Sequence, residues 1–288
     1  AKYILDAAGT PPMYGLSDIS QLLENVKIGA VLEPRSLEAI ADFLRGCRKT
    51  RDFMQKFLNT TPRVAGYSLG LTPYQEVEEE ILRSIVNGVV IDDASPGLRK
   101  VRRDIGRLKD KIRSKLEQII SSSESRAWLQ ETVVCLKDSR QVLMVKAGSK
   151  DKIPGIIHGS SGSGSTLFIE PLSVHQLNNE LRRLEGMEQE EIYQVLAVLS
   201  SEISSRINEI QYNLEIMAQY DLAFAKARLS RMMIGIEPLL NEEDRIVLIE
   251  ARHPLLTTPV PLDFYIGREY RSLIITGPNT GGKTVAMK

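Results

Sequence analysis

Eight residues near the end of the sequence have the types and the spacing that bind a nucleotide phosphate. They are Gly277, Pro278, Asn279, Thr280, Gly281, Gly282, Lys283 and Thr284. Together they complete the pattern G-x-x-x-x-G-K-[ST], in which glycines let backbone N–H groups converge on phosphate oxygens. We expect Lys283 to reach the β- and γ-phosphates and Thr284 to ligate Mg²⁺. The motif therefore predicts a P-loop that takes ATP or GTP together with Mg²⁺.

The sequence around this motif is suited to position it. An apolar run, Ser272–Thr276, leads directly into the loop, and the helix-compatible residues Val285–Lys288 follow it. Arg245–Ile249 forms another apolar run, and both runs predict buried strands. Residues 236–288 are thus predicted to begin an α/β ATPase domain. Because no acidic strand motif follows the P-loop, we expect this chain alone not to hydrolyse ATP.

Two long segments upstream carry apolar residues at alternating steps of three and four. The first extends from Leu98 to Ile119 and the second from Leu177 to Met217. This spacing puts one apolar seam on each helix, as in a coiled coil. We predict antiparallel arm helices at 98–126 and 173–233, and the second would be roughly 90 Å long.

The segment between the arms, residues 127–172, has a β pattern. Glu131–Lys146 alternates, is rich in valine and is interrupted by a turn at Asp138–Arg140, which indicates a hairpin. Ile156–His158 and Thr166–Ile169 are two further candidate strands, joined by the Ser/Gly loop 159–165. Residues 1–97 are predicted to form a helical core. The expected fold is mainly α: a helical core, clamp arms at 98–235 with an inserted β-module, and the truncated ATPase domain.

The two arms differ in charge. Residues 98–126 contain ten Lys or Arg and four Asp or Glu, whereas residues 173–219 contain three Arg and eight Glu. Opposite charge would draw the arms together and set their register. The basic arm could instead contact a phosphate backbone without reading its sequence. The candidate contacts to nucleic acid are Arg99, Lys100, Arg102, Arg103, Arg107, Lys109, Lys111, Arg113 and Lys115.

Composition and the isolated functional residues narrow the function classes. The 37 basic and 37 acidic residues exclude a globally basic protein that coats DNA, and two cysteines without metal spacing exclude a disulfide scaffold. No apolar run approaches the roughly 20 residues of a membrane span. His158 and His175 have no ligand cluster near them in sequence, which argues against a metal site. Trp128 is expected to pack, and the alternative is that it stacks on a base. The Ser/Gly loop is either an anion-binding nest or a flexible hairpin tip.

These residues resemble a known family. Thr276–Thr284 resembles the P-loop of the MutS family, and more closely that of its type-two branch. In mismatch-repair members, Met and then Gly or Ser usually stand at the positions of Thr280 and Gly281. Glu250–Leu256 resembles the segment that opens the family's ATPase domain, and Tyr220–Ala227 resembles the end of its long helix.

A further stretch resembles a signature of the type-two branch. It comprises Ser161–Pro171 followed by Asn178 and Asn179, and it departs from the branch at Gly159, where Asp is common. The resemblance covers nearly the whole sequence. It implies that the chain is a fragment of a longer protein and that His253 borders the nucleotide base. A histidine before proline is also typical of a structural turn.

The resemblance also implies a function for the parent protein. It would be a cytoplasmic, nucleoid- or ribosome-associated clamp ATPase without a mismatch-reading domain, using ATP and Mg²⁺ and dimerising through its ATPase domains. Its partner would be branched DNA in recombination or a stalled ribosome with its rRNA, and an additional C-terminal domain could supply endonuclease activity. The alternatives are a chromosome-organising coiled-coil ATPase, whose P-loop normally precedes the arm, and mismatch-repair MutS proper.

Overall fold

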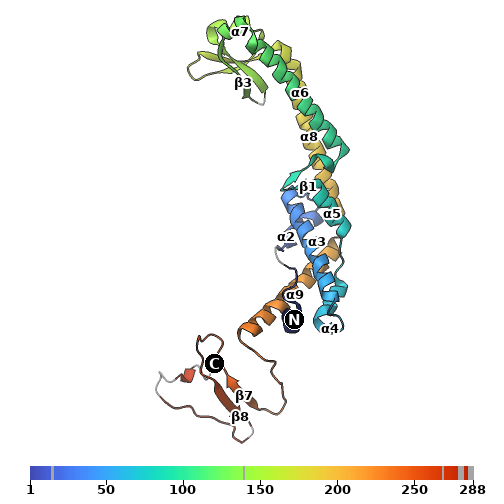
Figure 1. Ribbon diagram of the computed structural model, residues 1–288, viewed down its shortest axis with the longest axis vertical. Coiled ribbons are helices and arrows are strands. Elements are labelled where there is room, and N and C mark those ends of the chain that lie inside the picture. The colour runs from blue at the N-terminus through green and yellow to red at the C-terminus, as the bar shows by residue number, and fades with distance from the viewer. Residues whose placement is uncertain (14–15, 139, 268, 278–281, 285–288) are drawn as a thin grey trace. The chain divides into compact units, whose positions relative to one another are not determined.

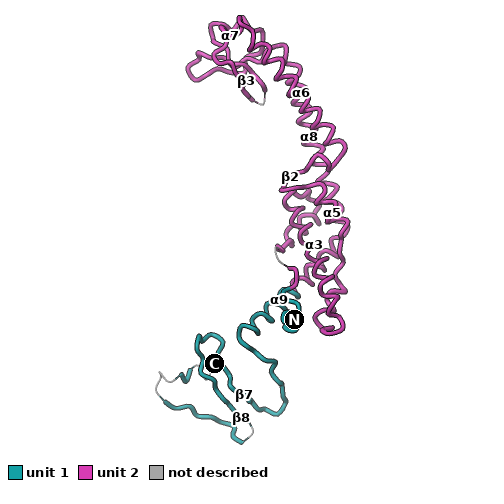
Figure 2. The backbone as a smooth tube through the Cα atoms, viewed as in Figure 1, with its two compact units in different colours: residues 1–10, 220–288 teal, residues 11–219 magenta. Residues whose placement is uncertain are grey.

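The computed structural model describes the chain except residues 14–15, 139, 268, 278–281 and 285–288. It divides into two compact units, coloured in Figure 2. One unit comprises residues 11–219. The other comprises residues 1–10 and 220–288. Each is described below by itself.

A group of short helices forms the core at the base of the larger unit (Figure 1). Their bounds are α2, Ser20–Lys27; α3, Pro34–Gln55; α4, Pro62–Ala65; the 3₁₀ helix η1, Gly66–Gly70; and α5, Gln75–Ser84. Pro34 stands in the first turn of α3, where a missing N–H costs nothing. One face of α3 is fully buried through Leu37, Ile40 and Leu44. This apolar spacing of three and four residues is what a helix with one buried face requires.

Two long helices continue from this core and pack against each other. A short hairpin, β1 (Ile85–Val86) and β2 (Val89–Val90), and the 3₁₀ helix η2 (Asp92–Ala94) lead into α6, Pro96–Ser121. Ser95 caps α6, its hydroxyl accepting from the Leu98 N–H at 2.9 Å. The partner helix is α8, Leu172–Ser204. The two lie side by side (Figure 1).

Both long helices are shorter than predicted. The expected helix at 98–126 ends at Ser121, and a separate helix, α7 (Ser123–Trp128), follows an extended Ser122. The expected helix at 173–233 is divided into α8 and α9 (Ile207–Met232), with Ser205 and Arg206 between them. At each break a serine side chain offers the backbone an alternative partner; the Ser205 hydroxyl, for example, donates to the Glu202 carbonyl at 2.7 Å. Among the described residues, no helix is long and apolar enough to cross a bilayer.

The β-module is a four-stranded antiparallel sheet with the order β3-β4-β6-β5. Its strands are β3, Leu129–Lys137; β4, Arg140–Lys146; β5, Gly155–Ser160; and β6, Thr166–Pro171, with the 3₁₀ helix η3, Ala147–Lys152, after β4. The predicted hairpin is present, with Lys137 opposite Arg140, and the two further strands also form. Ser139, in the predicted turn, lies outside the described residues.

One apolar cluster runs from the arm into the module. Ile112 and Leu116 of α6 and Val174 of α8 pack with Leu143 and Ile169 of the sheet, and all five are at most 1% exposed. Trp128 packs against the same cluster, as predicted. Since the seam of each helix and one face of the sheet share this cluster, the module is an extension of the arm's own core.

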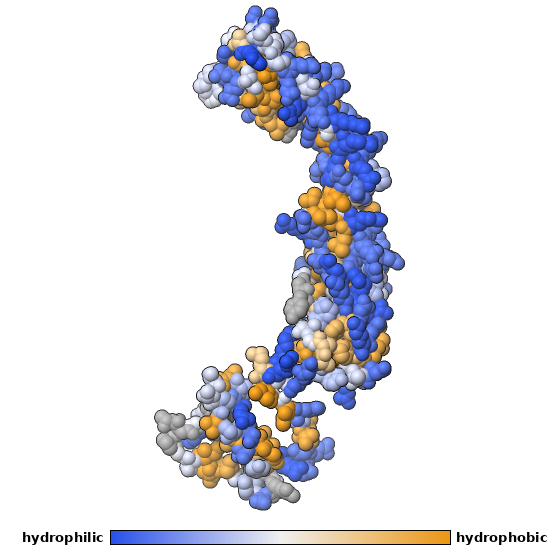
Figure 3. Space-filling view, in the orientation of Figure 1, coloured by the Kyte–Doolittle hydropathy of each residue, from blue (hydrophilic) through white to orange (hydrophobic). Residues whose placement is uncertain are grey.

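The smaller unit contains α1 (Lys2–Ala8), the end of α9 and an antiparallel pair of strands, β7 (Ile246–Ala251) and β8 (Leu262–Ile266). Here two predictions fail. Ser272–Thr276 forms no strand, and β7 is largely exposed, with Ile249 at 71%. A strand in an α/β domain is buried only when other elements cover both faces of its sheet. The described residues supply only two strands to this sheet, and Figure 3 shows hydrophobic patches on this unit.

Replacing Gly155 with alanine should destabilise the module. A Cβ at this position would lie 2.3 Å from the Glu170 carbonyl oxygen and 2.6 Å from Ile169, so the paired strands would have to separate. Overpacking of this kind typically costs about 1–3 kcal/mol. Denaturant unfolding followed by Trp128 fluorescence would measure the loss. Gly148→Ala is the control, because nothing lies within 4 Å of its Cβ position; equal effects would contradict the argument.

Candidate nucleotide and nucleic-acid sites

The structure describes only part of the predicted P-loop. Gly277 and Gly282 have φ values of 141° and 80°, which side-chain-bearing residues rarely adopt. The Lys283 ammonium donates to the Gly277 carbonyl, so the two ends of the loop are joined. Thr284 is exposed in the helical turn that begins at Lys283. Pro278, Asn279, Thr280 and Gly281 lie outside the described residues.

His253 has a structural contact in this chain. Its Nδ1 accepts from the Leu255 N–H at 3.2 Å, and its carbonyl accepts from the Leu256 N–H at 3.2 Å. Both contacts close the turn from His253 to Leu256, which contains Pro254. The turn role weighed for a histidine before proline is therefore present, and a contact to a nucleotide base remains a prediction.

Three of the nine candidate basic residues of α6 face α8. Arg102 donates to Glu188 at 2.7 Å and also to Asp92 of η2. Lys109 lies 3.4 Å from Glu185, and the Lys115 ammonium donates to the Ser173 carbonyl at 3.3 Å. These three side chains hold the two arm helices together, and the pairs of Arg102 and Lys109 with glutamates of α8 are of the kind that the opposite charges of the arms predict.

Four other basic residues form what we call the outer stripe, Lys100, Arg103, Arg107 and Lys111. Their steps of three, four and four place them on one face of α6, opposite the apolar seam. All four are exposed. Asp104 lies 3.8 Å from Arg103 and 3.9 Å from Arg107, and both contacts are weak and solvated. Figure 3 shows a mainly hydrophilic exterior along the arm.

The remaining two candidates are paired locally. Arg99 donates to Asp93 of η2 at 2.6 Å, and Arg113 donates to Glu117 one turn further along α6 at 2.8 Å. Both pairs are exposed, so they restrain these side chains only weakly. The structure thus divides the nine residues into three that contact α8, two that are locally paired, and the four of the outer stripe.

A buried carboxylate occupies the junction of the β-module with α8. The Glu170 side chain is fully buried and accepts from Arg140 at 2.9 Å, Asn178 at 2.7 Å, His158 at 2.7 Å and His175 at 3.1 Å. Sequence reasoning did not find this cluster, since its members come from β4, β5, β6 and α8. Among the described residues, no group of three or more His, Cys, Asp or Glu is arranged to hold a metal ion.

Two opposing effects act on the ionisation of Glu170. Burial raises the pKa of this carboxyl, but the hydrogen bonds from Asn178, His158, His175 and Arg140 outweigh it and leave the pKa below the usual value. The carboxylate therefore stabilises the fold at pH values above the ordinary glutamate pKa. That contribution is lost as the pH falls through the lowered folded-state pKa.

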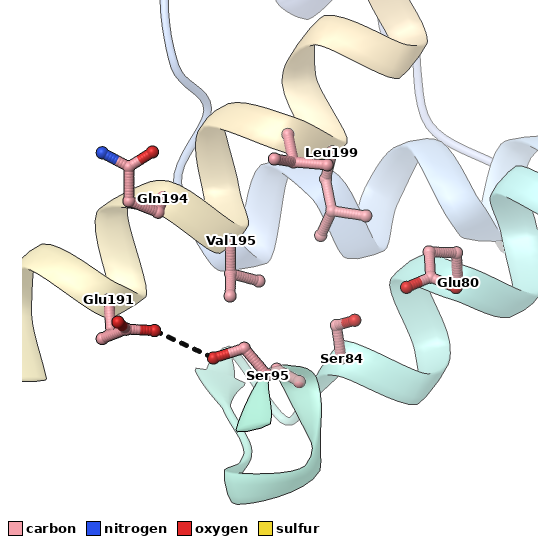
Figure 4. Close-up of a pocket in the computed structure, with 9 residues that line it drawn as sticks. Glu80, Ser84, Ser95, Glu191, Gln194, Val195 and Leu199 are labelled. Carbon is pink, nitrogen blue, oxygen red and sulfur yellow. Dashed lines mark hydrogen bonds between the residues drawn. The ribbon is translucent and has the colours of Figure 1, made fainter. Parts of the chain in front are cut away.

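A cavity of about 210 Å³ lies where α5, η2 and α8 meet (Figure 4). The Ser95 hydroxyl donates to Glu191 across it at 3.1 Å. A Cβ on Gly97 would lie 2.2 Å from the Glu191 carboxylate, so that carboxylate occupies the space beside the first turn of α6. Negative charge is favourable at a helix N-terminus. The cavity therefore belongs to the packing of α5 and η2 against α8, beside the start of α6.

Comparison with known proteins identifies the family. The chain is 41% identical over 286 residues to endonuclease MutS2 of Acetivibrio thermocellus, which covers 97% of this chain and 36% of that protein. It is 40% identical to endonuclease MutS2 of Alkaliphilus metalliredigens over 293 residues and of Clostridioides difficile over 294, covering all of this chain and 37% of each relative. The chain belongs to the MutS2 family. No protein-family model matches it.

This MutS2-family chain spans little more than a third of the length of those relatives. The resemblance drawn from the P-loop and the arm motifs is confirmed, and the alternative of mismatch-repair MutS proper is not supported by the relatives' names. Gly159, the departure from the branch signature, has φ 137° at an irregularity between β5 and β6. That conformation suits glycine and explains its presence here.

The branch signature, Ser161–Pro171 with Asn178 and Asn179, contained a sequence signal for the buried Glu170 cluster. Glu170 is the penultimate residue of the apolar strand β6, and Asn178 and Asn179 follow within the first two turns of α8 in this MutS2-family chain. A charged residue at a buried strand position needs hydrogen-bond partners, and amide side chains that follow closely in sequence can supply them. His158 and Arg140 carry no comparable signal, because sheet pairing alone brings them to Glu170.

Proposed function

We propose that this chain is the clamp-arm portion of a nucleic-acid-engaging ATPase of the MutS2 family. The outer stripe carries the proposal. Four exposed cations on one helix face, turned away from α8, suit the regular spacing of a phosphate backbone. Such a surface holds a polyanion without reading its sequence. Branched DNA and the rRNA of a stalled ribosome both fit this description.

The nucleotide end of the proposal rests on the P-loop. Gly277 and Gly282 have positive φ values, as a backbone that wraps around a phosphate needs. The Lys283 ammonium contacts the Gly277 carbonyl at the start of the same loop. Thr284 would hold Mg²⁺, and the bound metal–nucleotide would supply charge that draws loop groups together. The residues present therefore fit ATP and Mg²⁺.

Coupling of the two ends is part of the same proposal. In the parent protein, nucleotide contacts would bias the arrangement of its domains, and the paired α6 and α8 would act as coiled-coil arms that carry the change outward. A homodimer would close the clamp. We propose that the endonuclease activity in the relatives' name belongs to sequence beyond this chain.

The test uses the full-length protein. Replacing all four residues of the outer stripe with glutamine should weaken binding to branched DNA or to ribosomes by roughly 10- to 100-fold at moderate salt. The slope of log affinity against log salt should become shallower by about 0.9 for each phosphate that the protein no longer neutralises. ATP hydrolysis stimulated by the same partner should fall in parallel. If only branched DNA or only ribosomes stimulate ATP hydrolysis by the wild-type protein, that one is the partner.

The control removes the same charge elsewhere. Lys27, Lys56, Arg63 and Arg83 are exposed on the helical core, and their replacement with glutamine gives the same change in net charge. This control should retain affinity within about twofold. Equal losses in both sets would mean that only net charge matters, and stimulation by neither partner would overturn the proposed function.

A further inference from the structure

Helix α8 presents two neighbouring seams to the β-module. Val174, Leu177, Leu181 and Leu184 belong to the apolar cluster. His175, Asn178, Asn179 and Arg182 recur at steps of three, one and three, and every one of them hydrogen-bonds to the sheet or its turn. We call this second set the polar seam. Arg182 reaches the Asp138 carbonyl, and Asn178 reaches both the Gln141 carbonyl and Glu170.

Two residues of the polar seam, His175 and Asn179, form a closed ring of hydrogen bonds with Arg140 and Glu170 of the sheet. Arg140 donates from Nη1 to Glu170 and from Nη2 to Asn179 Oδ1, at 2.9 and 2.7 Å. The remaining amide group of Asn179 donates to His175 Nε2 at 3.2 Å, and His175 Nδ1 donates to Glu170 at 3.1 Å. Rotating the Asn179 amide would set its NH₂ against the Arg140 guanidinium. The ring is therefore satisfied in one direction only.

Asn178 of the polar seam makes directed hydrogen bonds to the module at the cost of one unpaired buried acceptor. It is 1% exposed, and its Oδ1 has no hydrogen-bond partner. Turning its amide over would place Oδ1 against the Glu170 carboxylate and the Gln141 carbonyl, so the unpaired acceptor is the less costly arrangement. A buried acceptor is left unpaired in order to keep two directed bonds to the module.

The two seams contribute differently. Apolar burial is non-directional, so the apolar seam holds the sheet to α8 but tolerates small rotations. Hydrogen bonds weaken steeply with angle, and a buried carboxylate without its partners is strongly unfavourable. We propose that Glu170 is a positioning residue that, through the polar seam, fixes the orientation of the β-module on the arm.

The consequence for the clamp rests on the proposed function. If the orientation is fixed, arm and module move as one body, and a nucleotide-driven shift at the base reaches the β3–β4 turn and the Ser/Gly loop undiminished. The distance measurement below tests the orientation alone. Its failure would therefore be distinguishable from failure of the arm to bind nucleic acid.

Spin labels at exposed positions measure the orientation directly. One pair, Ser163→Cys and Glu190→Cys, reports the loop of the module against α8, and a second pair, Ser163→Cys and Lys150→Cys, lies within the module. Cys135 is first replaced by serine. Cys47 is buried and its pKa is raised to about 12 by that burial, so it stays unlabelled.

Glu170→Gln is expected to broaden the distance distribution of the first pair roughly twofold and to leave that of the second pair unchanged. An unchanged first pair would overturn the proposal, because the apolar seam would then suffice. Broadening of both pairs would also overturn it, because Glu170 would then hold the module's own fold. Glu180→Gln is the matched control, a glutamate of α8 whose side chain is 45% exposed and which pairs, within the part of the chain that the structure describes, with Arg183 alone.

Two further measurements keep the proposal testable should Glu170→Gln fold poorly. Asn179→Ala breaks the ring from an exposed position on α8, and it should broaden the first pair alone. Nitrogen NMR should find the proton on Nδ1 of His175 in the wild-type protein and a mixture of tautomers in both variants. The opposite tautomer in the wild-type protein would contradict the ring.

Discussion

Replacing Arg48 with alanine is expected to destabilise the helical core by about 3–5 kcal/mol. Arg48 of α3 forms a two-point contact with Glu78 of α5, from Nε at 3.0 Å and from Nη2 at 2.9 Å. The Glu78 side chain is only 4% exposed. Without the guanidinium, its carboxylate would remain buried with no opposite charge, which explains the size of the effect. Urea denaturation of the two proteins at pH 7 would measure the difference.

The same helix offers a matched control. Arg45 pairs with Asp42 one turn away, and both side chains are substantially exposed. Its replacement with alanine should cost about 0–1 kcal/mol, since water solvates both charges once they separate. A double variant, Arg48→Ala with Glu78→Leu, should recover much of the loss. Comparable losses for Arg45→Ala and Arg48→Ala would show that burial of Glu78 does not control the stability.

Replacing Leu116 with alanine is the second change with a large expected effect, about 2–5 kcal/mol. Leu116 is fully buried where α6 meets the module, in the cluster that contains Leu143 and Ile169. Truncation leaves a cavity between a helix and a sheet, which cannot both relax into it. Thermal unfolding followed by Trp128 fluorescence should report a lower midpoint, because Trp128 packs on the same cluster.

Leu136 provides the same substitution at an exposed site. It lies in β3 with 72% of its surface accessible, so Leu136→Ala removes little packing and should change stability by less than about 0.5 kcal/mol. If Leu116→Ala were equally mild, the arm and the module would not share a core. They would instead be separate bodies joined by a flexible connection.

The sequence by itself determined the features that depend on local periodicity and on motifs. Heptad spacing located the apolar seam of α6, and alternation located the β3–β4 hairpin. The glycine, lysine and threonine spacing predicts the P-loop, which stays a prediction. These signals are local because a helix or strand repeats within a few residues. The family followed from motifs along nearly the whole sequence, and relatives at about 40% identity confirmed it.

The tertiary structure decided which residues meet. Arg102 contacts Glu188 of α8, whereas Arg103, one residue later, faces solvent. The charges in the sequence could not distinguish the two, because the rotation of α6 about its own axis decides which of them faces α8. The heptad pattern continued through the break after Ser204, so it could not show that the predicted helix at 173–233 ends there. Nor could it bring Arg140, His158 and His175 to Glu170, because sheet pairing and the placement of α8 join residues up to 35 positions apart. A buried charge is stable only once all its partners arrive, so the polar seam exists only in the folded molecule.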